Sequence, residues 1–212
     1  GDWGANVGRV LLSEFGSDIK NEARAYAAAA SDARMSGCEL PVVIVTGSGN
    51  QGITASVPVI RYAKHIGASD ERLYRALLVS DLVTIHQKTG IGRLSAYCGA
   101  VSAGCGAGAG IAYLLGGDYR AIAHTIVNAV AILSGTICDG AKPSCAAKIA
   151  SAVEAGILGY YMYVNDQQFR GGDGIVAKGV ENTIRNVGLL ASQGMKQTDR
   201  VILNIMTGDQ CL

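Results

Sequence analysis

The chain has 212 residues, of which 49% are apolar and 17% charged, and its formal net charge is +1. This length suits one substantial core, most simply in a single domain. A nearly neutral chain with no basic stripe among its aromatic residues is not expected to bind nucleic acid.

Helices dominate the elements expected along the chain. Alanine and glycine are abundant while aromatic residues make up only 6%, which favours closely packed helices over a β-sandwich. One β-branched run, residues 42–46, could form a strand before the glycine-rich segment 47–52. In chain order, helices are expected over residues 21–35, 53–66, 69–89, 91–115, 119–134, 143–164, 180–193 and 198–206. The sequence therefore predicts an all-α, compact bundle of about eight or nine helices.

The stretch from Leu94 to Gly117 has no charged residue and is long enough to span a bilayer. Because it consists mainly of Gly, Ala, Ser and Cys, the free energy gained by its transfer into lipid would be small. We therefore expect a buried Ala/Gly-rich central helix and no membrane partner. Six cysteines are too few for a disulfide scaffold, so reduced thiols in a cytoplasmic protein are expected.

Three cysteines lie beside glycine or alanine, where a cofactor has room. They are Cys98 in Ala-Tyr-Cys-Gly-Ala, Cys138 in Thr-Ile-Cys-Asp-Gly-Ala and Cys145 in Pro-Ser-Cys-Ala-Ala. Structural zinc sites close with four ligands, whereas three thiolates suit a cubane iron–sulfur cluster whose open iron acts as a Lewis acid. Free cysteines also serve as small core side chains, which is the interpretation favoured for Cys105, two turns beyond Cys98.

The segment Thr-Gly-Ser-Gly-Asn-Gln-Gly-Ile-Thr at 46–54 offers free amides and neutral polar groups before a predicted helix. Both features suit a bound carboxylate, because helix N-termini favour anions. The segment is not a phosphate P-loop, since the Gly-Lys-Ser/Thr ending is missing. An ordinary helix-capping loop would look similar. The candidate substrate-binding residues are Ser48, Gly49, Asn50, Gln51 and Thr54.

Lys88 and Arg93 are the candidate catalytic residues. Arg93 precedes Cys98 by five residues and is placed on the same predicted helix. A cation there could pair with a substrate carboxylate or offset the charge of a cluster. Solvated residues at a helix end would have the same pattern, so both interpretations stay open.

Several segments together resemble a known family. They are Ser-Asp-Ala-Arg-Met (31–35), Gly-Ser-Gly-Asn-Gln-Gly-Ile (47–53), Asp-Glu-Arg-Leu (70–73), Arg-Leu-Ser-Ala-Tyr-Cys (93–98), Ile-Cys-Asp-Gly-Ala (137–141) and Gln-Thr-Asp-Arg (197–200). In this order they are similar to the C-terminal half of bacterial L-cysteine desulfidases and, more distantly, to the α-chain of iron–sulfur L-serine dehydratases. The resemblance runs through nearly the whole chain, residues 1–212, and implies a [4Fe–4S] cluster with one open iron on Cys98, Cys138 and Cys145.

The resemblance also implies a partner. Full-length family members carry an N-terminal half of similar size, with a Gly-Cys-Thr-Glu-Pro-like segment implicated in catalysis, and this chain has no such segment. We therefore expect the cluster-binding domain of a truncated, cleaved or two-subunit enzyme, with the N-terminal half or a companion subunit as its partner. A homodimer is a further option.

The reaction implied is a β-elimination on a small amino acid, converting L-cysteine to pyruvate, ammonia and hydrogen sulfide. L-Serine dehydration is the alternative, and cysteine is favoured because Gly-Ser-Gly-Asn-Gln-Gly resembles the desulfidase branch. A non-enzymatic helical domain and a zinc-binding module are the rival classes.

Overall fold

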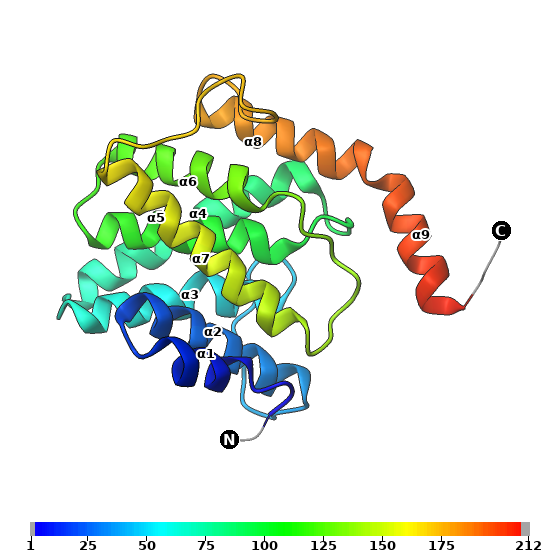
Figure 1. Cartoon of the computed structure of the whole chain (residues 1–212), viewed down its shortest axis with the longest axis horizontal. Coiled ribbons are helices and arrows are strands. Elements are labelled where there is room, and N and C mark those ends of the chain that lie inside the picture. The colour runs from blue at the N-terminus through cyan, green and yellow to red at the C-terminus, as the bar shows by residue number, and fades with distance from the viewer. Residues whose placement is uncertain (1–2, 209–212) are drawn as a thin grey trace.

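The alanine- and glycine-rich segment forms the central helix of an all-α fold (Figure 1). The computed structural model describes residues 3–208, and this part holds nine α-helices and one π-helical turn, with no β-strand. The predicted all-α class is thus confirmed. In chain order the elements are α1 (Val7–Phe15), α2 (Ile19–Met35), α3 (Gly49–His65), α4 (Asp70–Ile91), α5 (Gly99–Leu114), α6 (Tyr119–Leu133), α7 (Cys145–Val164), α8 (Val180–Leu189), the π-helical turn η1 (Leu190–Gly194) and α9 (Lys196–Thr207).

Glycines let the central helix α5 approach its two neighbours closely. A Cβ atom on Gly104 would lie 2.3 Å from the carbonyl oxygen of Ala152 in α7, and one on Gly108 would lie 2.6 Å from that of Gly156. On the other side, a Cβ on Gly106 would lie 2.5 Å from the carbonyl oxygen of Ser80 in α4. Helix α5 is therefore held between α4 and α7 at backbone contact distance.

Replacing Gly108 by alanine should destabilise the fold. Its new methyl group would meet the backbone of Gly156, which cannot rotate away, and overpacking of this kind costs about 1–3 kcal/mol. Urea denaturation followed by circular dichroism measures the change. Gly90→Ala in α4 is the matched control, since its nearest neighbour would lie at 3.4 Å, and it should be neutral or slightly stabilising. Equal stability of the two variants would contradict this packing of α5 against α7.

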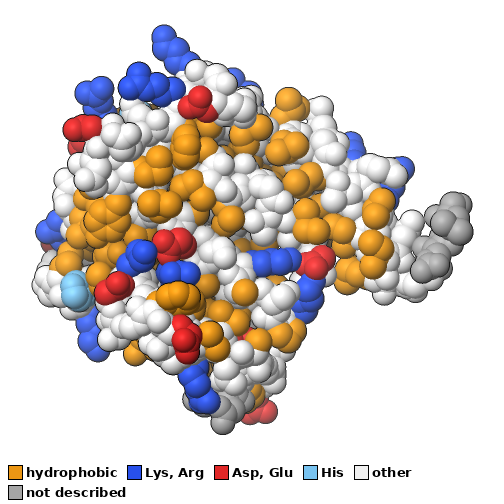
Figure 2. Space-filling view, viewed as in Figure 1, with side chains coloured by type: hydrophobic (Ala, Val, Ile, Leu, Met, Phe, Trp, Pro, Cys, Tyr) orange, Lys and Arg blue, Asp and Glu red, His pale blue; other side chains and the backbone are white. Residues whose placement is uncertain are grey.

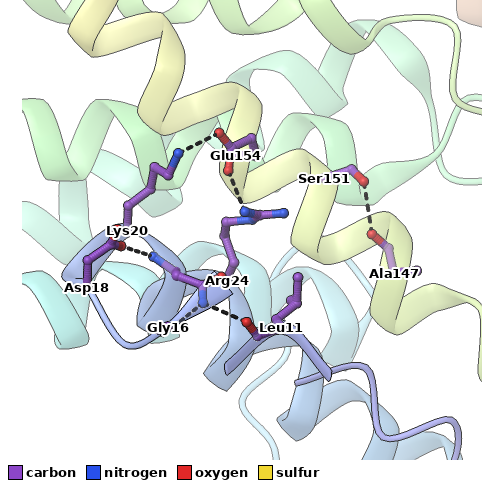
Figure 3. A network of polar contacts seen from close by, with 9 residues as sticks. Leu11, Gly16, Asp18, Lys20, Arg24, Ala147, Ser151 and Glu154 are labelled. Carbon is purple, nitrogen blue, oxygen red and sulfur yellow. Dashed lines mark hydrogen bonds and ion pairs between the residues drawn. The ribbon is translucent and has the colours of Figure 1, made fainter. Parts of the chain in front are cut away.

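Polar contacts join α2 to α7 on the outside of the bundle (Figure 3). Glu154 of α7 accepts a hydrogen bond from Lys20 Nζ at 3.2 Å and pairs with Arg24 Nη1 at 2.9 Å. Asp18 caps α2 by accepting from the backbone N–H of Asn21 at 2.7 Å. The two contacts of Glu154 hold α2 against α7.

Several elements differ from the prediction, among them α3, which begins at Gly49 and not at residue 53. The strand predicted at 42–46 is wrong, because this irregular segment has only an isolated bridge between Val45 and Ser48. The single helix predicted over 91–115 is also wrong in its first part, since α4 continues to Ile91 and Gly92, at φ 92°, ends it. Helix α1 was not predicted. The carboxylate of Asp32 accepts its first N–H group, that of Val7, at 2.9 Å.

No helix among residues 3–208 is both long enough and apolar enough to cross a membrane. Helix α5, which makes up most of the charge-free segment, is instead enclosed by α3, α4, α6 and α7. The prediction of a buried Ala/Gly-rich central helix is therefore confirmed.

Candidate functional site

A cavity of about 1010 Å³ lies where three helices begin. One residue from the start of each helix lines its wall. These residues are Ser48 (just before α3), Cys98 (just before α5) and Cys145 (the first residue of α7). The first N–H groups of an α-helix have no partner within the helix and carry a partial positive charge. The dipoles of three such ends favour an anionic ligand at the cavity, and the ends of α3 and α5 would supply the N–H groups, because at α7 the N–H groups of Cys145 and Ala146 already donate to the carbonyls of Lys142 and Pro143.

Most of the predicted site residues share this cavity. Those that line it are Ser48, Asn50, Gln51, Lys88, Arg93, Cys98, Cys138 and Cys145. Two predicted substrate-binding residues do not line it, namely Gly49 and Thr54. Thr54 is fully buried, and its hydroxyl donates to the Asn50 carbonyl oxygen at 2.6 Å within α3.

Gly49 makes room for an arginine that the sequence did not single out. A Cβ atom on Gly49 would lie 2.5 Å from Arg34 Nε. Arg34 Nη1 and Ser31 Oγ both donate to Asn50 Oδ1, at 3.2 and 3.3 Å. The side chain of Asn50 is thus held by α2, which explains why Ser31 and Arg34 occur together in one motif.

Gln51 lies against the N-terminus of α5. A Cβ on Gly99 would come within 2.4 Å of Gln51 Nε2, so the space beside Gly99 holds this side chain rather than a cofactor, contrary to our interpretation of the sequence. Thr46 Oγ1 donates to Gln51 Oε1, which orients the amide and leaves its N–H groups toward Gly99. The start of α3 and the start of α5 are therefore in direct contact.

A short backbone pairing brings two of the cysteines side by side. The backbone N–H of Cys138 donates to the Ala96 carbonyl at 2.6 Å, and that of Cys98 donates to the Thr136 carbonyl at 3.1 Å. The Cys98 thiol then donates to the Cys138 sulfur, which lowers the pKa of Cys138 and raises that of Cys98. Cys145 contributes the third thiol, with Sγ 3.6 Å from the Gly140 carbonyl oxygen.

Three cations and no acidic residue line the cavity within the described part of the chain: Lys88, Arg93 and Lys148. Lys88 is buried, and burial lowers its pKa although negative charge on Cys138 and Cys98 opposes the shift. Arg93 lies on the loop between α4 and α5 and not on the helix of Cys98, so its predicted helical position was wrong. The cavity is suited to a ligand with several negative charges.

Lys148 is a site residue that sequence reasoning missed. Its Nζ donates to the Ile137 carbonyl oxygen at 3.0 Å and to the carboxylate of Asp139, which Lys142 also contacts. The hydrogen bonds from Lys142 and from Lys148 to this carboxylate lower the pKa of Asp139 to about 2. The signal was available, because Lys148 follows Cys145 by three residues and so lies on the same face of α7.

Replacing Lys148 by methionine should weaken cofactor retention. The change removes the contacts that hold residues 137–139 against α7, and comparable outer contacts of metal ligands are worth about 10–100-fold in affinity. Iron bound per chain after anaerobic reconstitution and desalting measures the loss. Lys148→Arg, which keeps the charge, is the matched control. Equal iron retention in the methionine and arginine variants would show that this lysine does not hold the loop.

The chemistry of the donor set, three thiols, is that expected of a cluster site. Within residues 3–208, no group of three or more His, Cys, Asp or Glu side chains is spaced to hold one metal ion. The three thiols instead face a cavity that is large enough for a cofactor and a small molecule together. Cys98 and Cys138 would have to move apart to hold a cluster between them. Because Cys98 is fixed at the start of α5, this movement would fall to Cys138, which lies in the segment between α6 and α7.

The remaining thiols and imidazoles lie elsewhere. Cys105 is buried within α5 and does not line the cavity, and burial raises its pKa to about 12, as suits a core thiol. His86 is exposed and pairs with Glu181 at 2.8 Å. Cys211 falls outside the described residues.

An all-α domain whose helix N-termini, cations and thiols meet at one cavity has the features of a cofactor-binding enzyme domain. The chain matches the family model for the serine dehydratase alpha chain over residues 2–204, and it belongs to that family. This confirms the resemblance to the α-chain of L-serine dehydratases noted from the sequence.

Relatives of the chain include UPF0597 proteins of three bacteria. The chain is 69% identical over 211 residues to that of Desulfitobacterium hafniense, 55% over 204 to that of Lachnoclostridium phytofermentans and 54% over 206 to that of Finegoldia magna. The matches cover 100%, 96% and 97% of this chain but 49% of each relative. The chain thus spans about half the length of these relatives. No solved structure matches it significantly.

Proposed function

We propose that this chain is the cluster-binding part of an iron–sulfur lyase that catalyses β-elimination on a small L-amino acid, with L-cysteine and water giving pyruvate, ammonia and hydrogen sulfide. The observation that carries the proposal is the cavity: three thiols, three cations and three helix N-termini converge there, and no acidic residue among the described ones lines it. Membership of the serine dehydratase alpha-chain family supports it.

Each group has a role in the proposed reaction. Cys98, Cys138 and Cys145 would hold a [4Fe–4S] cluster, which when bound supplies an open iron that polarises the bond to the β-substituent. Asn50, Gln51 and the hydroxyl of Ser48 would hold the substrate carboxylate at the start of α3. Arg93 and Lys88 would balance the charge of the thiolates and the carboxylate. Burial of Lys88 strengthens that attraction.

The second candidate reaction is the dehydration of L-serine. The family description favours it, and the polar groups that hold a carboxylate and an amino group serve both substrates. The test is a comparison of pyruvate formation from L-cysteine and L-serine by the reconstituted protein combined with the remaining half of the relatives. A higher kcat/KM for L-serine would replace L-cysteine as the proposed substrate, and activity on neither would overturn the proposal.

Replacing Asn50 or Ser48 by alanine should weaken substrate binding without loss of iron. A hydrogen bond to a charged group is worth about 1.5–3 kcal/mol, or roughly 10- to 150-fold in affinity. The measurement is KM of the complete enzyme together with iron per chain. Ser56→Ala is the control, since its hydroxyl donates to the Gly52 carbonyl one turn along α3 and does not line the cavity. Unchanged kinetics in both test variants would show that the segment at the start of α3 serves only as a helix cap.

A further inference from the structure

Large apolar side chains are exposed on three segments that lie next to residues of the cavity wall. In the loop before α3, Val43 is 78% exposed, and in the loop between α4 and α5, Leu94 is 91% exposed while also lining the cavity. The third segment is α9, where Ile205 is 74% exposed. We call these side chains the apolar rim: Leu40, Val43, Ile44, Leu94, Ile205 and Met206.

Helix α9 belongs to this rim although it extends away from the other helices (Figure 1). The methyl group of Met206 would lie 3.1 Å from a Cβ on Gly140, and Gly140 lines the cavity. No described residue of α9 is buried, yet apolar residues from Val201 to Met206 cover a broad arc of it. Figure 2 shows hydrophobic side chains gathered along this C-terminal arm. An amphipathic helix normally buries such an arc against another surface.

We propose that the part of the enzyme missing from this chain docks on the apolar rim and closes the cavity. Exposed apolar side chains gathered in one region mark interaction sites. The relatives contain about as much chain again as the matched part, which supplies an occupant of sufficient size. Leu94 lines the proposed reaction site and Met206 lies beside Gly140 of its wall, so a partner on the rim could exclude water, which strengthens electrostatic contacts. This inference rests on the proposed function only in naming the partner.

A second exposed surface provides the competing location. On the outer face of α4, Tyr74, Leu78 and Leu82 follow each other at spacings of four residues and are exposed, and none of them lines the cavity. These residues share one face of the helix. A partner that did not need to reach the cavity could bind there equally well, so the two surfaces are distinguished by substitution.

The test uses the part of the Desulfitobacterium relative that lies outside the match, co-expressed with this chain carrying an affinity tag. We expect the two polypeptides to copurify, and Leu94→Glu combined with Ile205→Glu to raise Kd at least about tenfold, as loss of central apolar contacts does. Phe15→Glu is the matched control, because Phe15 is 68% exposed on α1 and does not line the cavity. Circular dichroism melting verifies that each variant is folded.

Three outcomes would overturn the proposal. In the first, Leu78→Glu abolishes association while the rim double variant binds normally. In the second, this chain dimerises alone and the rim double variant is monomeric, so the rim serves a second copy. In the third, segments aligned with 40–44, 92–95 and 196–207 exchange amide hydrogens as fast in the intact relative as in this chain. Loss of pyruvate formation with docking intact would count against the proposed reaction and not against this interface.

Discussion

Substituting Cys98, Cys138 or Cys145 by alanine should each sharply lower the iron bound after anaerobic reconstitution, from about four irons per chain expected for a [4Fe–4S] cluster. The three thiols are the only cysteines among the described residues that line the cavity. Iron and acid-labile sulfide assays measure the result, and a brown colour accompanies it.

Cys105→Ala is the control for these variants. Its thiol is buried in α5 beside Gln87, outside the cavity, so the iron content should not change. Loss of iron in Cys105→Ala together with normal iron in Cys98→Ala would show that the ligand assignment is wrong, although the class of enzyme could survive. A colourless protein from aerobic purification decides nothing by itself, since clusters with an open iron are sensitive to oxygen. Reconstitution is therefore part of the measurement.

The 212-residue chain alone should eliminate sulfide from L-cysteine about 10²–10⁴-fold more slowly than the complete enzyme, even with its cluster rebuilt. Elimination needs a positioned base as well as a Lewis acid, and a general base contributes a factor of this size. Among the described residues that line the cavity there is no carboxylate and no imidazole. Lys88 is the one buried amine in the cavity wall whose pKa is lowered.

Adding the remaining half, fused or as a separate chain, should restore sulfide, ammonia and pyruvate in equal amounts. The three products are quantified in one reaction, because their ratio distinguishes elimination from simple release of sulfide out of the cluster. Full turnover by the isolated chain would place the base within these residues. Lys88→Met would then be the first variant to examine, with Lys142→Met as a control, since Lys142 pairs with Asp139 and does not line the cavity.

Local sequence signals predicted much of this fold and site. The helix expected over 119–134 is observed as α6 (Tyr119–Leu133), and the Ser69 cap of α4 accepts from the backbone N–H of Arg72. Both depend on residues a few positions apart. Eight of the ten predicted site residues line one cavity, and most of these eight lie at helix starts or beside glycine, where backbone groups are accessible.

The features that escaped prediction depend on contacts between distant segments. Asp32 of α2 caps α1 by accepting from Val7, 25 residues earlier in the chain, so no local sequence pattern indicates that helix. The pairing of Ala96–Cys98 with 136–138 replaces the first turns of the helix predicted from residue 91. Gly49 was predicted to bind the substrate, but the space beside it is occupied by the side chain of Arg34, which belongs to another helix. The helix propensity of a local segment does not predict such contacts between distant segments.

The glycines of α5 have a consequence for how ligands would bind. Gly104 and Gly108 meet the backbone of α7, and Gly106 that of α4, so a shift of α5 by one residue would drive methyl groups into both neighbours. Helix α5 therefore has one axial position, and the N–H groups and thiol at its start are preset relative to the starts of α3 and α7. A preorganised site spends little free energy on ordering when its ligand arrives. The loops in front of the cavity are left to adapt to the ligand.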